Sequence, residues 1–253
     1  MHKALFAIFL MTLLGFHSTA LGKDEHPPLR VAVDAPYPPF AMVDKRGNLS
    51  GFDVDIANAL CAELKRTCVI KSVPFDRILP AIVAGEYDIA IAGMGVTPER
   101  QQLVDFTDRY FRSLSIFIEK KGTVPPADFK GMRIGAQSGT LQEEYLRKNF
   151  GDSITLVTKT SHEEALRMLK NGQLDLVLVD GLPGYAYLKS EDGDGLETVE
   201  APVVSSDIQD SSCIAVSKKQ PELRDAINKA IQSLRRSGEY GRINRKYFDF
   251  NIY

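Results

Sequence analysis

The chain has 253 residues, of which 44% are hydrophobic and 25% charged, and its formal net charge is −2. A chain so close to neutrality has no electrostatic basis for binding nucleic acid or an anionic membrane, so we expect neither partner. The length allows two lobes of roughly 100 residues, each with its own buried core, and two lobes imply a cleft between them.

The chain starts with a segment typical of a secretory signal peptide. A short basic start precedes an apolar run from Ala4 to about Phe16, and the small residues Ala20 and Gly22 suit cleavage before Lys23. An apolar run of about 13 residues is too short to span a bilayer. We therefore expect residues up to Gly22 to be removed and the mature chain to be exported as a soluble protein.

The remainder alternates strand-like and helical patterns, which predicts an α/β fold with two mainly parallel sheets flanked by helices. The predicted strands are the short apolar runs at 29–34, 68–73, 87–92, 132–136, 154–158, 174–179 and 212–217.

Two extended segments, 111–120 and 202–210, are the predicted connections between the lobes, because each borders a stretch rich in proline or serine. The second lobe would then be an insertion in the first. This division assigns residues 23–113 and 211–253 to lobe 1 and residues 114–210 to lobe 2.

One pattern occurs twice: a helix, a glycine that ends it, two further residues, an aspartate and a buried strand. Gly85 and Asp88 belong to the first copy, and Gly172 and Asp175 to the second. The alternative is chance, since helix-glycine-strand units are common in α/β proteins. If the lobes do correspond, the carboxyl ends of both strands border the same cleft, where ligands of open α/β sheets bind.

Arg100 stands where a cation is disfavoured. Thr97, Pro98, Glu99 and Arg100 fit the N-cap, N1, N2 and N3 positions of a helix, whose first-turn N–H groups carry about half a positive charge. A bound carboxylate would stabilise the guanidinium there, whereas screening by Glu99 is the alternative that needs no ligand. The strand of the second repeat ends at Asp180. A zwitterion would satisfy both Arg100 and Asp180 across one cleft.

Cys61 and Cys68 lie at the end of a predicted helix and the start of a predicted strand, so in an oxidising compartment they suit a local disulfide. Two buried free thiols are the alternative. Cys213 lies in an apolar run and has no obvious partner. With three cysteines and only His26 and His162 beyond the leader, no metal-ligand cluster can be assembled, and we expect no metal and no cofactor.

Several short motifs are spread over the whole mature chain. They are Asp34-Ala-Pro-Tyr-Pro-Pro-Phe40, Gly51-Phe-Asp-Val-Asp55, Phe75-Asp-Arg-Ile-Leu-Pro80, Thr97-Pro-Glu-Arg-Gln-Gln102, Asp105-Phe-Thr107, Gln137-Ser-Gly-Thr140, Asp180 and Lys246-Tyr-Phe-Asp-Phe-Asn-Ile-Tyr253. Together they resemble periplasmic solute-binding proteins of the polar amino-acid type (family 3). The last run and the cysteine spacing are most similar to the lysine/arginine/ornithine- and histidine-binding members.

This resemblance implies a two-lobed periplasmic-binding-protein fold of type II. It also implies a monomeric periplasmic receptor that binds a polar, basic L-amino acid (arginine, lysine, ornithine or histidine). The expected partners are the membrane permease and ATPase components of an ABC importer, although a sensor of the same ligand would use the same site.

The resemblance also implies how the two ends of the amino-acid headgroup are held. Arg100 would pair with the α-carboxylate, helped by backbone N–H groups near Gly95 and Leu141. Asp180 would accept from the α-ammonium, helped by the carbonyl near Gly93.

The ligand's side chain has its own expected contacts. Tyr37 and Phe75 would sandwich it, Asp34 would meet a cationic group at its far end, Gln137 would tune the choice of side chain, and Ala92 would border the site. The structural alternatives are a loop-shaping role for Tyr37, a core role for Phe75 and a turn-capping role for Asp34.

Other residues are expected to be structural. Asp53 and Asp55 fit the first turn of a helix, Tyr185 and Tyr187 fit packing within lobe 2, and His162 begins a helix whose pattern is typical of a surface.

Gly95 departs from the family, which usually has serine or threonine there, and its missing side chain predicts extra space in the site. That space would suit an N-substituted amino acid such as an opine, whereas Asp180 favours a primary ammonium. An enzyme is the other alternative, because cyclohexadienyl dehydratases resemble this family. They carry a glutamate three residues after the position of Asp180, where this chain has Pro183, which cannot transfer a proton. We therefore expect a binding protein.

Overall fold

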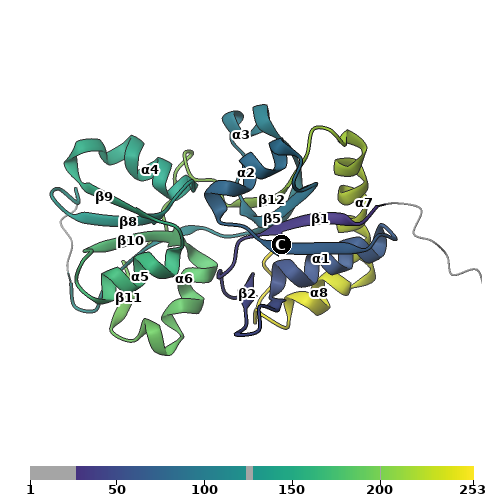
Figure 1. Ribbon diagram of the computed structural model, residues 1–253. Helices are drawn as coiled ribbons and strands as arrows, with labels where there is room; N and C mark the ends of the chain where they lie inside the picture. The colour runs from purple at the N-terminus through teal and green to yellow at the C-terminus, as the bar shows by residue number, and fades with distance from the viewer. Residues whose placement is uncertain (1–26, 124–127, 200) are drawn as a thin grey trace, which may run out of the picture.

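The computed structural model describes residues 27–123, 128–199 and 201–253, so the predicted signal peptide, residues 1–22, lies outside the described residues. Two lobes lie side by side, each built on a five-stranded sheet with helices packed against it (Figure 1). None of the helices in these three ranges is long and apolar enough to cross a bilayer.

The sheet of lobe 1 has the strand order β4-β1-β5-β12-β6. Its strands are β1 (Leu29–Val33), β4 (Cys68–Ser72), β5 (Ile89–Met94), β6 (Asp105–Arg112) and β12 (Ser211–Val216). Five helices accompany them: α1 (Phe52–Glu63), α2 (Phe75–Ala84), α3 (Pro98–Leu103), α7 (Pro221–Ser237) and α8 (Glu239–Asn244). A two-stranded sheet of β2 (Met42–Val43) and β3 (Leu49–Ser50) precedes α1.

The sheet of lobe 2 has the order β11-β7-β10-β8-β9. Its strands are β7 (Ser115–Lys120), β8 (Arg133–Gln137), β9 (Thr155–Lys159), β10 (Leu176–Asp180) and β11 (Leu196–Thr198). The helices of this lobe are α4 (Leu141–Phe150), α5 (His162–Lys170) and α6 (Gly181–Leu188).

The two sheets have the same architecture. In lobe 1, β1 pairs in parallel with β4 and β5, and β12 runs antiparallel to both β5 and β6. In lobe 2, β8 pairs in parallel with β9 and β10, and β7 runs antiparallel to both β10 and β11. Each sheet therefore has four strands in one direction and one reversed strand, which agrees with the predicted mainly parallel α/β lobes.

The chain passes between the sheets twice, and the two crossings contact each other. The first is shorter than predicted: most of 111–120 belongs to β6 and β7, and only Ser113 and Leu114 connect them. The return crossing lies between β11 and β12. The Ser113 N–H donates to the Asp210 carbonyl at 2.8 Å, so the crossings form a two-stranded connection. The sheets thus divide the chain much as the sequence indicates, while the outer limits of the lobes stay a prediction.

The internal repeat is confirmed in atomic detail. In lobe 1 the backbone N–H and Nε of Arg30 donate to Asp88 Oδ2 at 2.9 and 3.1 Å, and its Nη1 donates to the Gly85 carbonyl. In lobe 2 the same atoms of Arg133 donate to Asp175 Oδ2 at 2.8 and 3.1 Å. Nη2 of Arg133 also donates to the carbonyl of Gly172, which follows the helix before Asp175. The strands that follow, β5 and β10, therefore begin alike.

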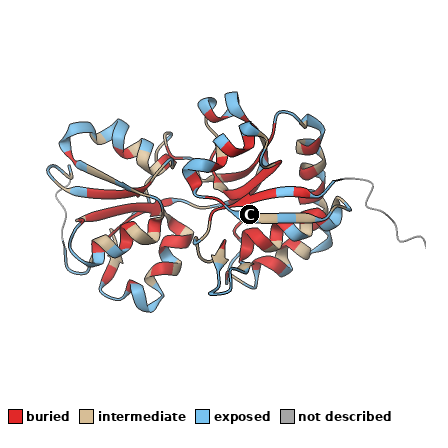
Figure 2. Cartoon of the chain, in the orientation of Figure 1, coloured by how far each residue is buried: buried red, intermediate tan, exposed pale blue. Residues whose placement is uncertain are grey.

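Apolar side chains pack on both faces of each sheet, and Figure 2 shows the buried residues concentrated in the strands and on the helix faces turned toward them. A disulfide joins Cys61 at the end of α1 to Cys68 at the start of β4, as the spacing indicates. Because burial on both faces fixes the strands, their carboxyl ends are held firmly at the boundary between the lobes.

Candidate functional site

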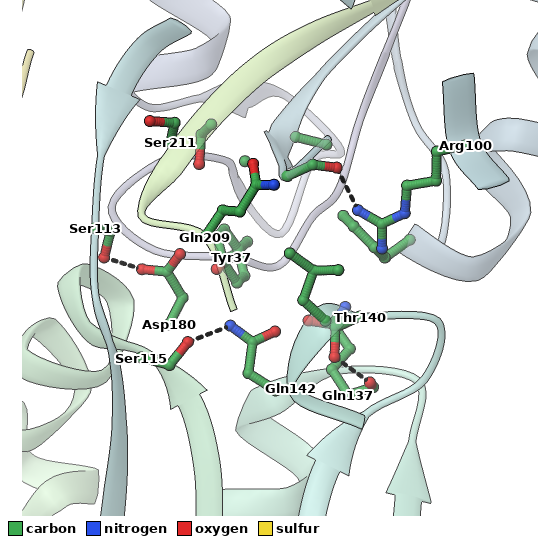
Figure 3. A pocket seen from close by; sticks show the side chains of 16 residues that line it. Tyr37, Arg100, Ser113, Ser115, Gln137, Thr140, Gln142, Asp180, Gln209 and Ser211 are labelled. Atoms are coloured by element: carbon green, nitrogen blue, oxygen red, sulfur yellow. Dashed lines mark hydrogen bonds between the residues drawn. The ribbon is translucent and has the colours of Figure 1, made fainter. Parts of the chain in front are cut away.

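A pocket lies between the two lobes, where β5 and β10 end. It is lined by nine of the ten predicted binding residues: Tyr37, Phe75, Ala92, Gly93, Gly95, Arg100, Gln137, Leu141 and Asp180. Figure 3 shows Arg100 and Asp180 on opposite sides of this pocket, with Tyr37 and Gln209 between them in the view.

Arg100 occupies the position that the sequence indicates, N3 of α3. Its N–H donates to Thr97 Oγ1 at 3.2 Å, which confirms Thr97 as the N-cap. The side chain is buried, and Nη1 and Nη2 donate to the carbonyls of Gly95 at 2.6 Å and Gly139 at 2.9 Å. Burial lowers the pKa of Arg100 to about 10, which still leaves it charged at neutral pH.

No carboxylate forms a salt bridge with Arg100 in the part of the chain that the structure describes. Glu99, the alternative partner, is exposed, whereas the guanidinium is turned inward toward two carbonyl oxygens. Neutral carbonyls compensate a buried cation less well than an anion does. The position therefore has the character of an anion site.

Asp180 ends β10 and is the N-cap of α6. Its Oδ1 accepts from the Leu182 N–H at 3.2 Å and from the Ser113 hydroxyl. Burial raises the pKa of Asp180 to about 6, although both of these hydrogen bonds favour the ionised form. The carboxyl group is thus fixed in direction and ready to accept from a cation in the pocket.

Asp34 does not itself line the pocket but lies directly behind Gln137, which does. Gln137 Nε2 donates to Asp34 Oδ2 at 2.7 Å, a buried hydrogen bond between the two lobes. Burial raises the pKa of Asp34 to about 7, against the lowering effect of the Gln137 hydrogen bond, and the negative charge of nearby Asp76 raises it further. Asp34 is therefore a buried acid beside the site whose ionised form a bound cation would favour.

His162 does not lie on an exposed helix face, so that prediction is wrong. Its side chain is 3% exposed, and its ring meets the Tyr37 ring edge-on with 4.8 Å between centroids. The N-terminus of α5 points toward lobe 1, and the lobe contact covers the histidine. Burial lowers the pKa of His162 to about 3, so the ring is neutral and adds no charge to the site.

The aromatic pair contacts the pocket as predicted, and one of its members also belongs to the core. Tyr37 packs against Phe40, with centroids 5.8 Å apart, and lines the pocket. Phe75 begins α2, is packed in the core of lobe 1 and lines the pocket too. The core alternative for Phe75 and its binding role are therefore compatible.

Asp53 lies in the first turn of α1 as predicted, but it also supports the pocket wall. Its Oδ1 accepts from the Tyr110 hydroxyl at 3.0 Å, and that hydroxyl accepts from the Gly93 N–H at 2.8 Å. Asp55 instead accepts from Lys246 Nζ at 2.7 Å. Asp53 therefore reaches the pocket through Tyr110.

The expected packing of the two lobe 2 tyrosines holds for one of them. Tyr187 is buried in the core of lobe 2, whereas Tyr185 is 45% exposed.

The sequence reasoning missed a group of polar residues at the back of the pocket. Five of them come from the two crossings and from the strands next to them, and two come from the N-terminus of α4: Ser113, Ser115, Gln209, Ser211 and Ser212, then Thr140 and Gln142. Gln142 Nε2 donates to Ser115 Oγ at 2.9 Å, which fixes part of this wall (Figure 3). The predicted connections at 111–120 and 202–210 were the available signal, because a cleft between lobes is closed at the back by its hinge.

The space expected beside Gly95 is filled. A Cβ atom on Gly95 would lie 2.5 Å from Cδ1 of Leu141, so the leucine side chain occupies the place of the missing one. The prediction of extra room is wrong because it considered lobe 1 alone.

No group of three or more histidine, cysteine, aspartate or glutamate side chains within the described ranges is arranged to hold a metal ion. The chemistry of the pocket is therefore that of one buried cation, two acids with raised pKa, aromatic rings and neutral hydrogen-bonding groups.

Two lobes of matching topology with a charged pocket between them define a two-lobed ligand-binding protein. The chain belongs to the bacterial extracellular solute-binding proteins, family 3, whose model matches residues 29–250. It is 34% identical over 256 residues to the L-arginine-binding protein of Pseudomonas aeruginosa, covering 99% of this chain and 97% of that protein. It is 30% identical over 260 residues to the lysine/arginine/ornithine-binding periplasmic protein of Escherichia coli, covering 100% of this chain and 99% of that protein.

Solved structures give the same result. An ancestral arginine-binding protein bound to arginine is 34% identical, with a TM-score of 0.81 over 88% of this chain and 99% of that one. A Salmonella typhimurium periplasmic binding protein with high arginine specificity is 31% identical, with a TM-score of 0.81 over 88% of this chain and 100% of that one. Because these relatives are binding proteins, the chain is a binding protein and not an enzyme.

Proposed function

We propose that the protein is a periplasmic receptor for a basic L-amino acid, with arginine as the first candidate, and that it delivers this ligand to an ABC importer. The observation that carries the proposal is the buried guanidinium of Arg100, which has no carboxylate partner among the described residues and shares one pocket with Asp180 and the adjoining Asp34.

Charge complementarity supports a basic ligand over a neutral one. The site contributes one positive group, Arg100, and two acids, Asp34 and Asp180, whose raised pKa values reflect the cost of burying them ionised. A basic amino acid supplies the opposite set, one carboxylate and two cations. A neutral amino acid would leave Asp34 with only the uncharged Gln137 amide as a partner in a poorly solvated place.

The orientation of the ligand follows from the positions of these groups. Its α-carboxylate would meet Arg100 and the N-terminus of α4, where the backbone N–H of Leu141 begins the helix. Its α-ammonium would meet Asp180. Its side chain would lie between Tyr37 and Phe75 and point toward Asp34.

A ligand placed in this way contacts both lobes, so it favours the arrangement in which they touch. Arg100 and Asp34 come from lobe 1, while Asp180 and Gln137 come from lobe 2. The closed pair of lobes would then present the surface that the permease and ATPase components recognise, with the receptor acting as a monomer. The names of the relatives, which are arginine- and lysine/arginine/ornithine-binding proteins, support this class of ligand.

The test is calorimetric titration of the chain from Lys23 onward, unfolded and refolded to strip carried-over ligand, against arginine, lysine, ornithine, histidine and glutamine. We expect binding at micromolar concentration or tighter for a cationic amino acid and weaker binding for glutamine. Arg100→Gln and Asp180→Asn should each abolish it. Arg46→Gln and Asp152→Asn change exposed residues of the same types and serve as matched controls.

The proposal fails if no cationic amino acid binds. It also fails if glutamine binds as tightly as arginine and Asp34→Asn leaves the two affinities unchanged.

A further inference from the structure

Gly95 and Leu141 form a close contact across the pocket. Gly95 follows β5 of lobe 1, and Leu141 is the first residue of α4 in lobe 2. A Cβ on Gly95 would lie 2.5 Å from Leu141 Cδ1 and 3.5 Å from Cγ, so no larger residue fits while the leucine keeps this position. The two residues are complementary in shape: a glycine in one lobe receives a leucine from the other.

Arg100 holds this contact together. Its Nη1 donates to the carbonyl of Gly95 itself, and its Nη2 donates to the carbonyl of Gly139, two residues before Leu141. Thr140 caps α4 by accepting from the Glu143 N–H at 3.3 Å, which fixes the start of the helix. The leucine is therefore positioned by the same guanidinium that would bind the α-carboxylate.

The space that Leu141 occupies borders hydrogen-bonding groups. The carbonyl of Ser211 lies 4.0 Å from the Cβ position of Gly95, and the side chains of Gln142 and Ser115 line the same pocket. Without the leucine, the space beside Gly95 would be open to the pocket. With it, an apolar side chain fills this part of the wall, and Leu141 is 7% exposed.

We propose that Leu141 is a specificity-determining residue that restricts the site to amino acids with an unsubstituted headgroup. An amino acid whose α-nitrogen carries a carboxyalkyl group needs room beside the headgroup. The leucine removes that room, because its side chain fills the space beside Gly95. This inference rests on the proposed function, since it takes Arg100 and Asp180 as the headgroup-binding residues.

The test compares arginine with octopine, which is arginine carrying a carboxyethyl group on its α-nitrogen. We expect wild type to bind arginine at least about 100-fold more tightly than octopine, and Leu141→Ala to narrow that ratio at least about tenfold by gaining affinity for octopine. Leu146→Ala, in the same helix but in the core of lobe 2, is the matched control and should leave the ratio unchanged. Comparable affinities in wild type, or an unchanged ratio in Leu141→Ala, would overturn the proposal.

A second experiment tests the contact without any ligand. Gly95→Ala should lower the melting temperature of the stripped protein, because the added methyl group displaces the Leu141 side chain from its packed position. The same substitution in the Leu141→Ala background should not, because the small side chain then has room. Equal effects in both backgrounds would show that Leu141 does not occupy the space beside Gly95. If wild type binds neither arginine nor octopine, the proposed function fails. The comparison of Gly95→Ala in the two backgrounds still shows whether Leu141 fills the space beside Gly95.

Discussion

Gln137 of lobe 2 donates its side-chain amide to the carboxyl group of Asp34 in lobe 1, and the 2.7 Å hydrogen bond is buried between the lobes. A neutral donor opposite a buried acid compensates its charge only in part, and the pKa of Asp34 is raised to about 7. The acid is therefore partly protonated near neutral pH until a cation reaches it. Several properties of the protein depend on this.

Affinity for a basic amino acid should fall as the pH is lowered from 8 to 5. A bound cation favours the ionised forms of Asp34 and Asp180, whose pKa values are raised to about 7 and about 6, so protons compete with the ligand below these values. Calorimetry in buffers of different ionisation enthalpy should show proton release on binding near pH 7. A pH-independent affinity over this range would contradict the assignment of both acids.

Asp34→Asn should stabilise the stripped protein at pH 8 while weakening arginine binding. A carboxyl group whose pKa is raised in the folded state destabilises that state wherever it is ionised, and asparagine keeps an acceptor for Gln137. We expect the melting temperature to rise by a few degrees at pH 8. The gain should shrink as the pH falls from about 7 toward 4, because the wild-type group becomes protonated in the folded state over this range while it stays largely ionised in the unfolded chain. If Asp34→Asn were less stable than wild type at pH 8, the negative charge of Asp34 would be compensated in the folded protein.

Removing the disulfide should weaken the fold and leave binding intact. The link closes a short loop between α1 and β4, with a sequence separation of 7, so its loss should cost about 2 kcal/mol. Cys61→Ala/Cys68→Ala should melt several degrees lower in denaturation scans but bind arginine with unchanged affinity. Wild type treated with a reductant should behave like the double variant, and a loss of affinity beyond about threefold would contradict this.

The two equivalent aspartates of the repeat should differ in their contribution to stability. The side chain of Asp88 is 5% exposed and also accepts from Gln220 Nε2 at 2.7 Å, whereas the side chain of Asp175 is 33% exposed. Asp88→Ala should therefore lower the free energy of unfolding by about 2 to 3 kcal/mol, and Asp175→Ala by about 1 kcal/mol or less. Denaturant titration of both variants measures the difference. Equal losses of unfolding free energy would mean that solvent exposure does not weaken the contact between Arg133 and Asp175.

Local sequence signals predicted where several pocket-lining residues lie in the fold. Arg100 could be placed at N3 of α3 because Thr97, Pro98 and Glu99 define the helix start by themselves. Asp180 could be placed at a strand end because it directly follows a short apolar run and precedes Gly181. These features depend on a few neighbouring residues, so they can be recognised without knowing how the lobes meet.

Features created by the contact between lobes were the ones that sequence reasoning missed. His162 follows a polar helical pattern, yet its side chain is buried and its ring contacts Tyr37 of the other lobe. The filling of the space at Gly95 depends on Leu141, which lies 46 positions later in the chain. Such contacts join residues of two different lobes, and a local sequence pattern contains no information on how the lobes meet.

The matching clamps of Arg30 with Asp88 and Arg133 with Asp175 have a consequence for how this protein arose. Two units that share strand order, strand directions and the same arginine-aspartate contacts are what duplication of one ancestral half would produce. In that history each copy kept this contact, which serves folding, while the opposite end of its strand changed. One half now carries the cation Arg100 and the other the anion Asp180, so the selectivity that we propose for a dipolar molecule would come from divergence between two originally equivalent halves.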